Sequence, residues 1–150
     1  MSQSLQLFKK KSLFFISFMR DKTKKYESSI QVNSTELTTI LEQVEFATEN
    51  TPRLVANNMT EWLSPYIEKI IQGDEDFLTS LNLSDEGVDD EYLPISESIR
   101  DMWNQMSKEE KDELLNYFRL ILTLGVLATR KESMLRTINS YRAPNKQLSL

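Results

Sequence analysis

Apolar residues recur at three- and four-residue steps along most of this chain, which is the period of a helix buried on one face. The first such segment covers residues 1–30, where an apolar stripe from about residue 4 onward shares the helix with a basic face. Further helices are predicted over residues 33–50 and from residue 52, with a kink or restart at Ser64-Pro65 because an interior proline loses a backbone hydrogen bond. Strand signals are nearly absent, so the pattern predicts an all-α fold.

A central apolar helix is predicted near residues 108–128. Ser107 and Glu110 form a capping box, which marks the start of this helix. Little polar surface is left after residue 114, so this helix is expected at the centre of a bundle and is expected to persist past Arg130. We predict a single domain over residues 1–150, built as a bundle of roughly five to seven helices.

Two segments lack apolar periodicity. Residues 139–150 are polar and turn-forming, and are predicted to be a flexible tail. Residues 82–94 are predicted to be an acidic loop that ends in proline. Its acids could loosely gather a divalent ion, but acidic runs in loops are more often solvated surface, and that is our interpretation here. The predicted acidic surface consists of Asp85, Glu86, Asp89, Asp90 and Glu91.

Composition narrows the possible chemistry. The 150 residues include neither Cys nor His, which removes disulfides, thiolate metal sites, the commonest general base and the usual zinc ligand. The three glycines form no phosphate-binding loop. We therefore expect no catalytic residues, no metal and no cofactor, and we interpret the chain as a non-enzymatic protein. An enzyme that uses a pair of carboxylates is the last alternative.

Charge is sorted into blocks along the chain. Residues 1–25 carry seven Lys and Arg against one acid, residues 36–113 carry twenty acids against five bases, and residues 114–150 carry six bases against one acid. The formal net charge is −5. Such polarity governs encounter and partner choice, so it indicates a protein that binds through charged patches and aromatic anchors. Its partners would be other proteins or further copies of itself.

The basic N-terminal helix supplies the candidate partner-binding residues: Lys9, Lys10, Lys11, Phe14, Phe15, Phe18 and Arg20. Three interpretations remain open. The aromatic stripe could pack within the protein's own bundle, it could insert into an anionic membrane surface as part of a peripheral helix, or the bases could contact nucleic acid for packaging. Nucleic acid is the least expected partner, because the chain is acidic overall and contains no recognisable reading module.

Neither a secretion signal nor a membrane span is predicted. The lysines at 9–11 precede an apolar run over residues 12–19 as in a signal peptide, but Arg20 interrupts the run and no cleavage pattern follows. The longest other apolar run, residues 120–128, is far shorter than the roughly 20 residues that span a bilayer. We expect an intracellular protein.

Two stretches carry a family resemblance. The first reads WLSPYI at residues 62–67 and leads to GDEDFL at 73–78; the second reads IRDMW at 99–103 and leads through SKEEK at 107–111 to YFRLIL at 117–122. This layout, over residues 62–125, resembles small helical proteins encoded by nucleocytoplasmic large DNA viruses. The resemblance implies a viral structural, assembly or host-interaction protein in the virion or the host cytoplasm, with no cofactor and no active site to carry over.

Overall fold

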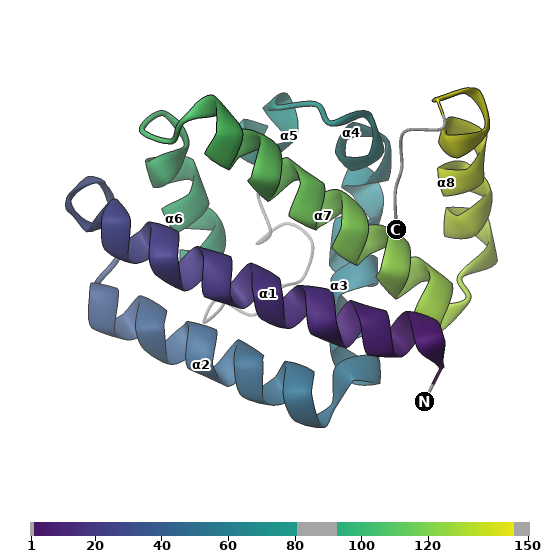
Figure 1. Cartoon of the computed structure of the whole chain (residues 1–150), viewed down its shortest axis with the longest axis horizontal. Helices are drawn as coiled ribbons and strands as arrows, with labels where there is room; N and C mark the ends of the chain where they lie inside the picture. Colours follow the sequence, from purple (N-terminus) through teal and green to yellow (C-terminus); the bar gives the residue numbers. More distant parts are fainter. Residues whose placement is uncertain (1, 81–92, 146–150) are drawn as a thin grey trace.

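The computed structural model describes residues 2–80 and 93–145, and over these residues the chain is an all-α bundle without strands (Figure 1). The predicted single-domain helical bundle is thereby confirmed. In chain order its α-helices are α1 (Gln3–Lys25), α2 (Ser34–Asn50), α3 (Pro52–Leu63), α4 (Ile67–Gln72), α5 (Asp76–Ser80), α6 (Leu93–Trp103), α7 (Lys108–Thr129) and α8 (Glu132–Asn145). Short 3₁₀ turns, η1 (Glu27–Ser29) and η2 (Ser64–Tyr66), connect α1 to α2 and α3 to α4.

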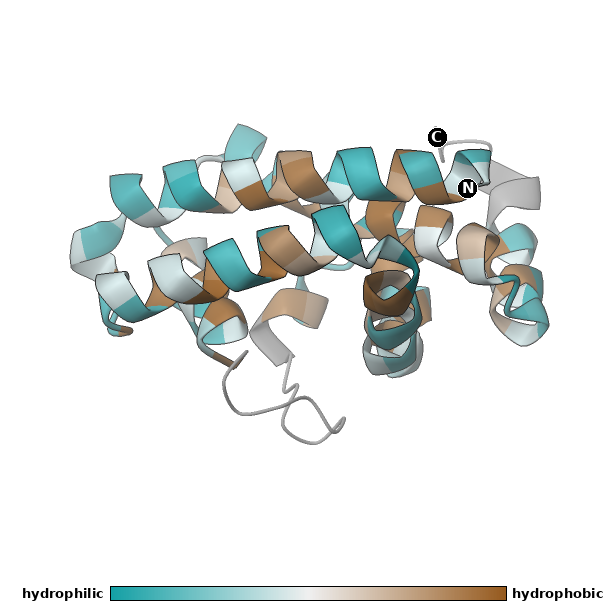
Figure 2. Cartoon of the chain, turned by 90° about the horizontal axis from the view of Figure 1, so that it is seen from below, coloured by the Kyte–Doolittle hydropathy of each residue, from teal (hydrophilic) through white to brown (hydrophobic). Residues whose placement is uncertain are grey.

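Helix α1 lies between α2 and α7, and runs antiparallel to both (Figure 1). Its most extensive packing is against α7, followed by α2, so the basic N-terminal helix is an integral part of the bundle. Hydrophobic and hydrophilic segments alternate along α1 and α2 (Figure 2), as expected for helices that bury one face. Helix α3 crosses behind α1 and packs on α7.

The core gathers around α7, the helix that the sequence predicted at the centre of the bundle. Leu114, Leu122 and Val126 of α7 are fully buried, and α1 contributes the fully buried side chains of Phe8 and Met19. Because interiors are close-packed, a change of even one methylene at such positions alters stability.

Helices α3 and α7 approach closely at Gly125. A Cβ atom at this position would lie 2.9 Å from the Met59 Cε and 3.0 Å from the Thr60 Cγ2. The Met59 methyl can move aside, whereas the Thr60 hydroxyl is buried and donates a hydrogen bond of 2.8 Å to the Ala56 carbonyl. Because glycine has no side chain, α3 can approach α7 this closely at Gly125.

Gly125→Val is expected to lower the free energy of unfolding by about 2 kcal/mol, because overpacking between α3 and α7 outweighs the gain in helix propensity. Chemical denaturation followed by circular dichroism measures this change. Asn116→Val, at an exposed position of the same helix, is the control and should change stability by less than about 0.5 kcal/mol. Equal effects of the two substitutions would contradict the close approach.

The structure corrects several predicted boundaries. The first helix ends at Lys25, short of the predicted residue 30, and η1 follows it. Helix α7 ends where Arg130 adopts a left-handed conformation with φ of 53°, so the helix does not persist past this residue; α8 begins at Glu132. The restart at Ser64-Pro65 is present as η2. The helix ends at Lys25 and at Arg130 were not predicted, because neither is followed by the glycine that often marks the end of a helix.

The predicted tail and acidic loop are also redrawn. Helix α8 continues to Asn145, so the tail predicted from residue 139 is wrong over its first half. At the acidic loop, α6 already begins at Leu93. The remainder of the predicted loop and of the tail lies outside the described residues.

Candidate interaction surface

The structure separates the aromatic side chains that the sequence grouped on the N-terminal helix. Phe18 is buried, with 7% of its surface exposed, and its ring centroid lies 5.4 Å from that of Tyr117. Phe15 is half-buried and stacks edge-on against Phe118 at 5.5 Å. Phe14 is 47% exposed. Two of the three predicted aromatic anchors are therefore core residues, and only Phe14 faces outward.

Phe14 is flanked by two of the predicted bases. The Lys10 Nζ lies 5.9 Å and the Lys11 Nζ 5.7 Å from its ring centroid, within the range of cation–π contacts. Lys10 is one helical turn from Phe14, so the two side chains share a face. Among the residues that the structure describes, neither lysine forms an ion pair. We call Lys10, Lys11 and Phe14 the α1 patch.

The remaining predicted bases do not join this patch. Arg20 makes a bidentate ion pair with Glu45 of α2, at 2.7 and 3.0 Å. The hydrogen bonds of this pair raise the pKa of Arg20 and lower the pKa of Glu45. Arg20 therefore connects α1 to α2 through this ion pair. Lys9 is half-buried, and its spacing of five residues from Phe14 places it on a different side of α1.

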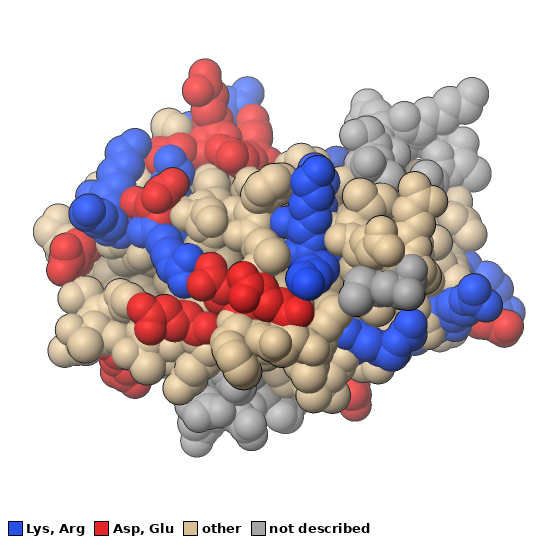
Figure 3. All heavy atoms as spheres, turned by 60° about the horizontal axis from the view of Figure 1, so that its bottom comes forward, with Lys and Arg blue, Asp and Glu red and all other residues tan. Residues whose placement is uncertain are grey.

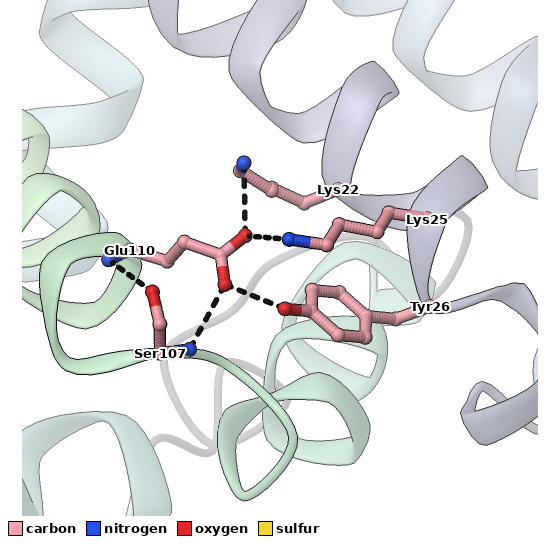
Figure 4. A network of polar contacts seen from close by, with 5 residues as sticks. All are labelled: Lys22, Lys25, Tyr26, Ser107 and Glu110. Atoms are coloured by element: carbon pink, nitrogen blue, oxygen red, sulfur yellow. Dashed lines mark hydrogen bonds and ion pairs between the residues drawn. The ribbon is translucent and has the colours of Figure 1, made fainter.

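A second polar network joins the C-terminal end of α1 to the start of α7 (Figure 4). The buried Glu110 carboxylate lies 2.9 Å from the Lys22 Nζ and 3.2 Å from the Lys25 Nζ, and it also accepts a hydrogen bond from the Tyr26 hydroxyl. In the capping box the Glu110 carboxylate accepts a hydrogen bond from the Ser107 backbone N–H at 2.9 Å. The backbone N–H of Glu110 donates to the Ser107 hydroxyl at 3.1 Å.

Burial alone would raise the pKa of the Glu110 carboxyl, but the bonds from Lys22, Tyr26, Ser107 and Lys25 outweigh it and hold the pKa far below its usual range. The carboxylate is therefore ionised at neutral pH and cannot serve there as a general acid. Its role is to anchor α1 to α7. The sequence identified the capping box, but nothing in it indicated that lysines some 85 positions earlier would bind the same carboxylate.

Sequence reasoning missed a second exposed group, on α2. Phe46 is 69% exposed and lies between the exposed acids Glu42 and Glu49. Glu42 and Glu49 share one side of α2 with Glu45, three and four residues away, and Glu45 pairs with Arg20 of α1. This acidic side therefore borders α1. The spacing of the glutamates along the sequence could have indicated an acidic side of this helix, but not the exposure of Phe46. We call Glu42, Phe46 and Glu49 the α2 patch.

Basic and acidic side chains accordingly lie side by side on the face formed by α1 and α2 (Figure 3). The charge blocks of the sequence partly neutralise one another inside the chain, through Arg20 and Glu45 and through the Glu110 network. The predicted acidic surface at Asp85, Glu86, Asp89, Asp90 and Glu91 lies outside the described residues.

Cavities between α1 and its neighbours are further candidate sites. A cavity of about 320 Å³ lies between the end of α1 and the start of α2, and its charged lining groups are Arg20, Lys24 and Glu27. A smaller cavity, of about 120 Å³, is apolar and includes the Ser12 hydroxyl, which is buried without a hydrogen-bond partner. Within residues 2–80 and 93–145, no three acidic side chains gather in a way that could hold a metal ion.

Comparisons of this chain with protein-family models, with curated proteins and with solved structures found no match. The resemblance to proteins of large DNA viruses therefore stays a prediction.

Proposed function

We propose that this chain is a non-enzymatic interaction protein that docks onto another protein through the α1 patch. The observation that supports the proposal is the exposure of Phe14 between Lys10 and Lys11 on an otherwise polar helix face. An exposed aromatic ring contributes affinity when a partner buries it, and flanking charges steer the encounter and set register. The partner surface that fits is acidic, with an apolar recess for one ring.

The packing of α1 disfavours the membrane interpretation and the nucleic-acid interpretation. A membrane-bound α1 would need Phe15 and Phe18 at the lipid interface, yet both pack against α7. No helix of the described residues is long and apolar enough to cross a bilayer. Nucleic-acid packaging would draw on the bases of α1, and three of these, Arg20, Lys22 and Lys25, are already bound to carboxylates. A protein partner requires none of these contacts to break.

The viral resemblance bears on where such docking would take place. As part of the same proposal, the α1 patch would serve virion assembly or the binding of a host protein. What supports this is the resemblance over residues 62–125, which lies outside the patch itself. The docking proposal rests on the α1 patch and does not need the viral assignment.

Photo-cross-linking tests the docking proposal. A benzophenone-bearing phenylalanine analogue at position 14 is expected to give discrete cross-linked species, because a bound partner covers this ring. The same analogue at Asn139, an exposed position of α8, is the control and should not give these species. Mass spectrometry identifies the products.

Charge reversal by Lys10→Glu with Lys11→Glu should reduce the position-14 products at least tenfold, which corresponds to about 1.4 kcal/mol of binding free energy. Identical products from positions 14 and 139, or products that persist after charge reversal, would exclude docking through this patch. Co-sedimentation with phosphatidylserine-rich vesicles that depends on Phe14 would favour the membrane interpretation instead.

A further inference from the structure

The α1 and α2 patches have matching designs and opposite charge. In each, one exposed phenylalanine lies within about one helical turn of two like charges: Phe14 with two lysines, and Phe46 with two glutamates. In the part of the chain that the structure describes, no ion pair engages the charged groups of either patch. A surface that carries Phe46 among carboxylates is the kind of partner that the α1 patch requires.

The two patches also lie on neighbouring helices. Helices α1 and α2 are side by side and antiparallel (Figures 1 and 2), and the pair between Arg20 and Glu45 fixes their register. Glu42 and Glu49 lie on the side of α2 that borders α1, so the acidic patch belongs to the same molecular face as α1 (Figure 3). Two copies related by a two-fold axis on this face would each present a basic patch to an acidic one.

We propose that the partner of the α1 patch is a second copy of this chain, bound through a two-fold interface in which each α1 patch contacts the α2 patch of the other copy. The inference rests on the proposed function, since it names the partner for the same docking surface. In each copy, Phe14 and Phe46 are removed from water on association, and Lys10 and Lys11 acquire carboxylate partners. The Arg20–Glu45 pair and the Glu110 network stay intact.

This interface predicts a specific dependence on salt. The net charge of −5 makes two copies repel at long range, whereas the patches attract locally. Added salt screens exposed charges beyond a Debye length of about 10 Å at 0.1 M, and it also weakens exposed ion pairs. We expect sedimentation velocity to show a concentration-dependent monomer–dimer equilibrium that weakens as salt is raised above physiological concentration.

Charge reversal gives a sharper test. One variant carries Lys10→Glu with Lys11→Glu, so both of its patches are acidic; the other carries Glu42→Lys with Glu49→Lys, so both of its patches are basic. Each variant alone should associate at least tenfold more weakly than the original chain. A mixture of the two should form a heterodimer, because both of its reciprocal contacts are again complementary.

Asp112→Lys with Glu113→Lys, at exposed positions of α7, is the matched control for the basic variant and should dimerise as the original chain does. Circular dichroism checks that every variant is folded. Phe46→Ser, which leaves all charges in place, should also weaken association and gives a second test if a charge variant fails to fold.

Three outcomes would overturn the inference: an original chain that stays monomeric at every salt concentration up to the physiological one, a mixture of the two charge variants that does not associate, or assemblies that grow beyond a dimer. A monomeric chain whose position 14 still cross-links to a different protein would overturn the second copy as partner and leave the proposed function standing. A chain that is monomeric and forms no specific cross-link at position 14 would overturn both.

Discussion

Phe18→Ala is expected to lower the free energy of unfolding by about 3 to 4 kcal/mol, whereas Phe14→Ala should change it by less than about 0.5 kcal/mol. The two residues lie one helical turn apart on α1. Phe18 is 7% exposed, packs against Tyr117 of α7 and lies beneath the Lys22 ammonium, whose Nζ is 5.4 Å from the ring centroid. Its removal leaves a cavity at the contact between α1 and α7, while truncation of the exposed Phe14 leaves none.

Urea denaturation of both variants, followed by far-ultraviolet circular dichroism, measures the difference. Phe15→Ala should give an intermediate loss, because this side chain is half-buried against Phe118. Equal and small effects at positions 14 and 18 would mean that α1 is not packed as the structure has it, and the membrane interpretation of the N-terminal helix would regain its aromatic anchors.

Glu110→Ala is expected to destabilise the fold by about 3 kcal/mol, since it removes the reciprocal half of the helix cap together with charge-assisted hydrogen bonds to a buried carboxylate. Glu110→Gln should lose less, because the amide oxygen can still accept from Tyr26 and from the Ser107 N–H. Glu109→Ala, at the exposed neighbouring position in the same first turn, is the matched control and should change stability by less than about 0.5 kcal/mol.

The pH dependence follows from the lowered pKa of Glu110. The usual glutamate value of 4.5 applies to the unfolded chain, and the folded-state pKa lies well below it. The contribution of the carboxylate is therefore complete above about pH 4.5 and is lost as the pH falls from there toward the folded-state pKa, by up to about 1.4 kcal/mol per pH unit. The stability difference between the original chain and Glu110→Gln should shrink over that acidic range. A difference that stays constant between pH 6 and about pH 3 would contradict the ionised network.

The candidate site was only partly predictable. The sequence pointed to the segment around Phe14 and its neighbouring lysines because bases and aromatic residues are interleaved there, and the structure leaves Phe14 exposed. It could not show that Arg20 would be occupied by Glu45, which is 25 positions away. It also gave no reason to select Phe46, since an aromatic residue among helical polar positions looks the same whether a neighbouring helix covers it or not.

The sequence by itself determined the helical class, the capping box at Ser107 and Glu110, and the restart at Pro65, because these depend on interactions within one or two turns of the chain. The tertiary structure decided which phenylalanine of α1 is exposed to solvent and which bases form ion pairs with carboxylates. The physical reason is that an amphipathic stripe defines a broad buried face, while the positions of α2 and α7 around α1 determine where that face ends.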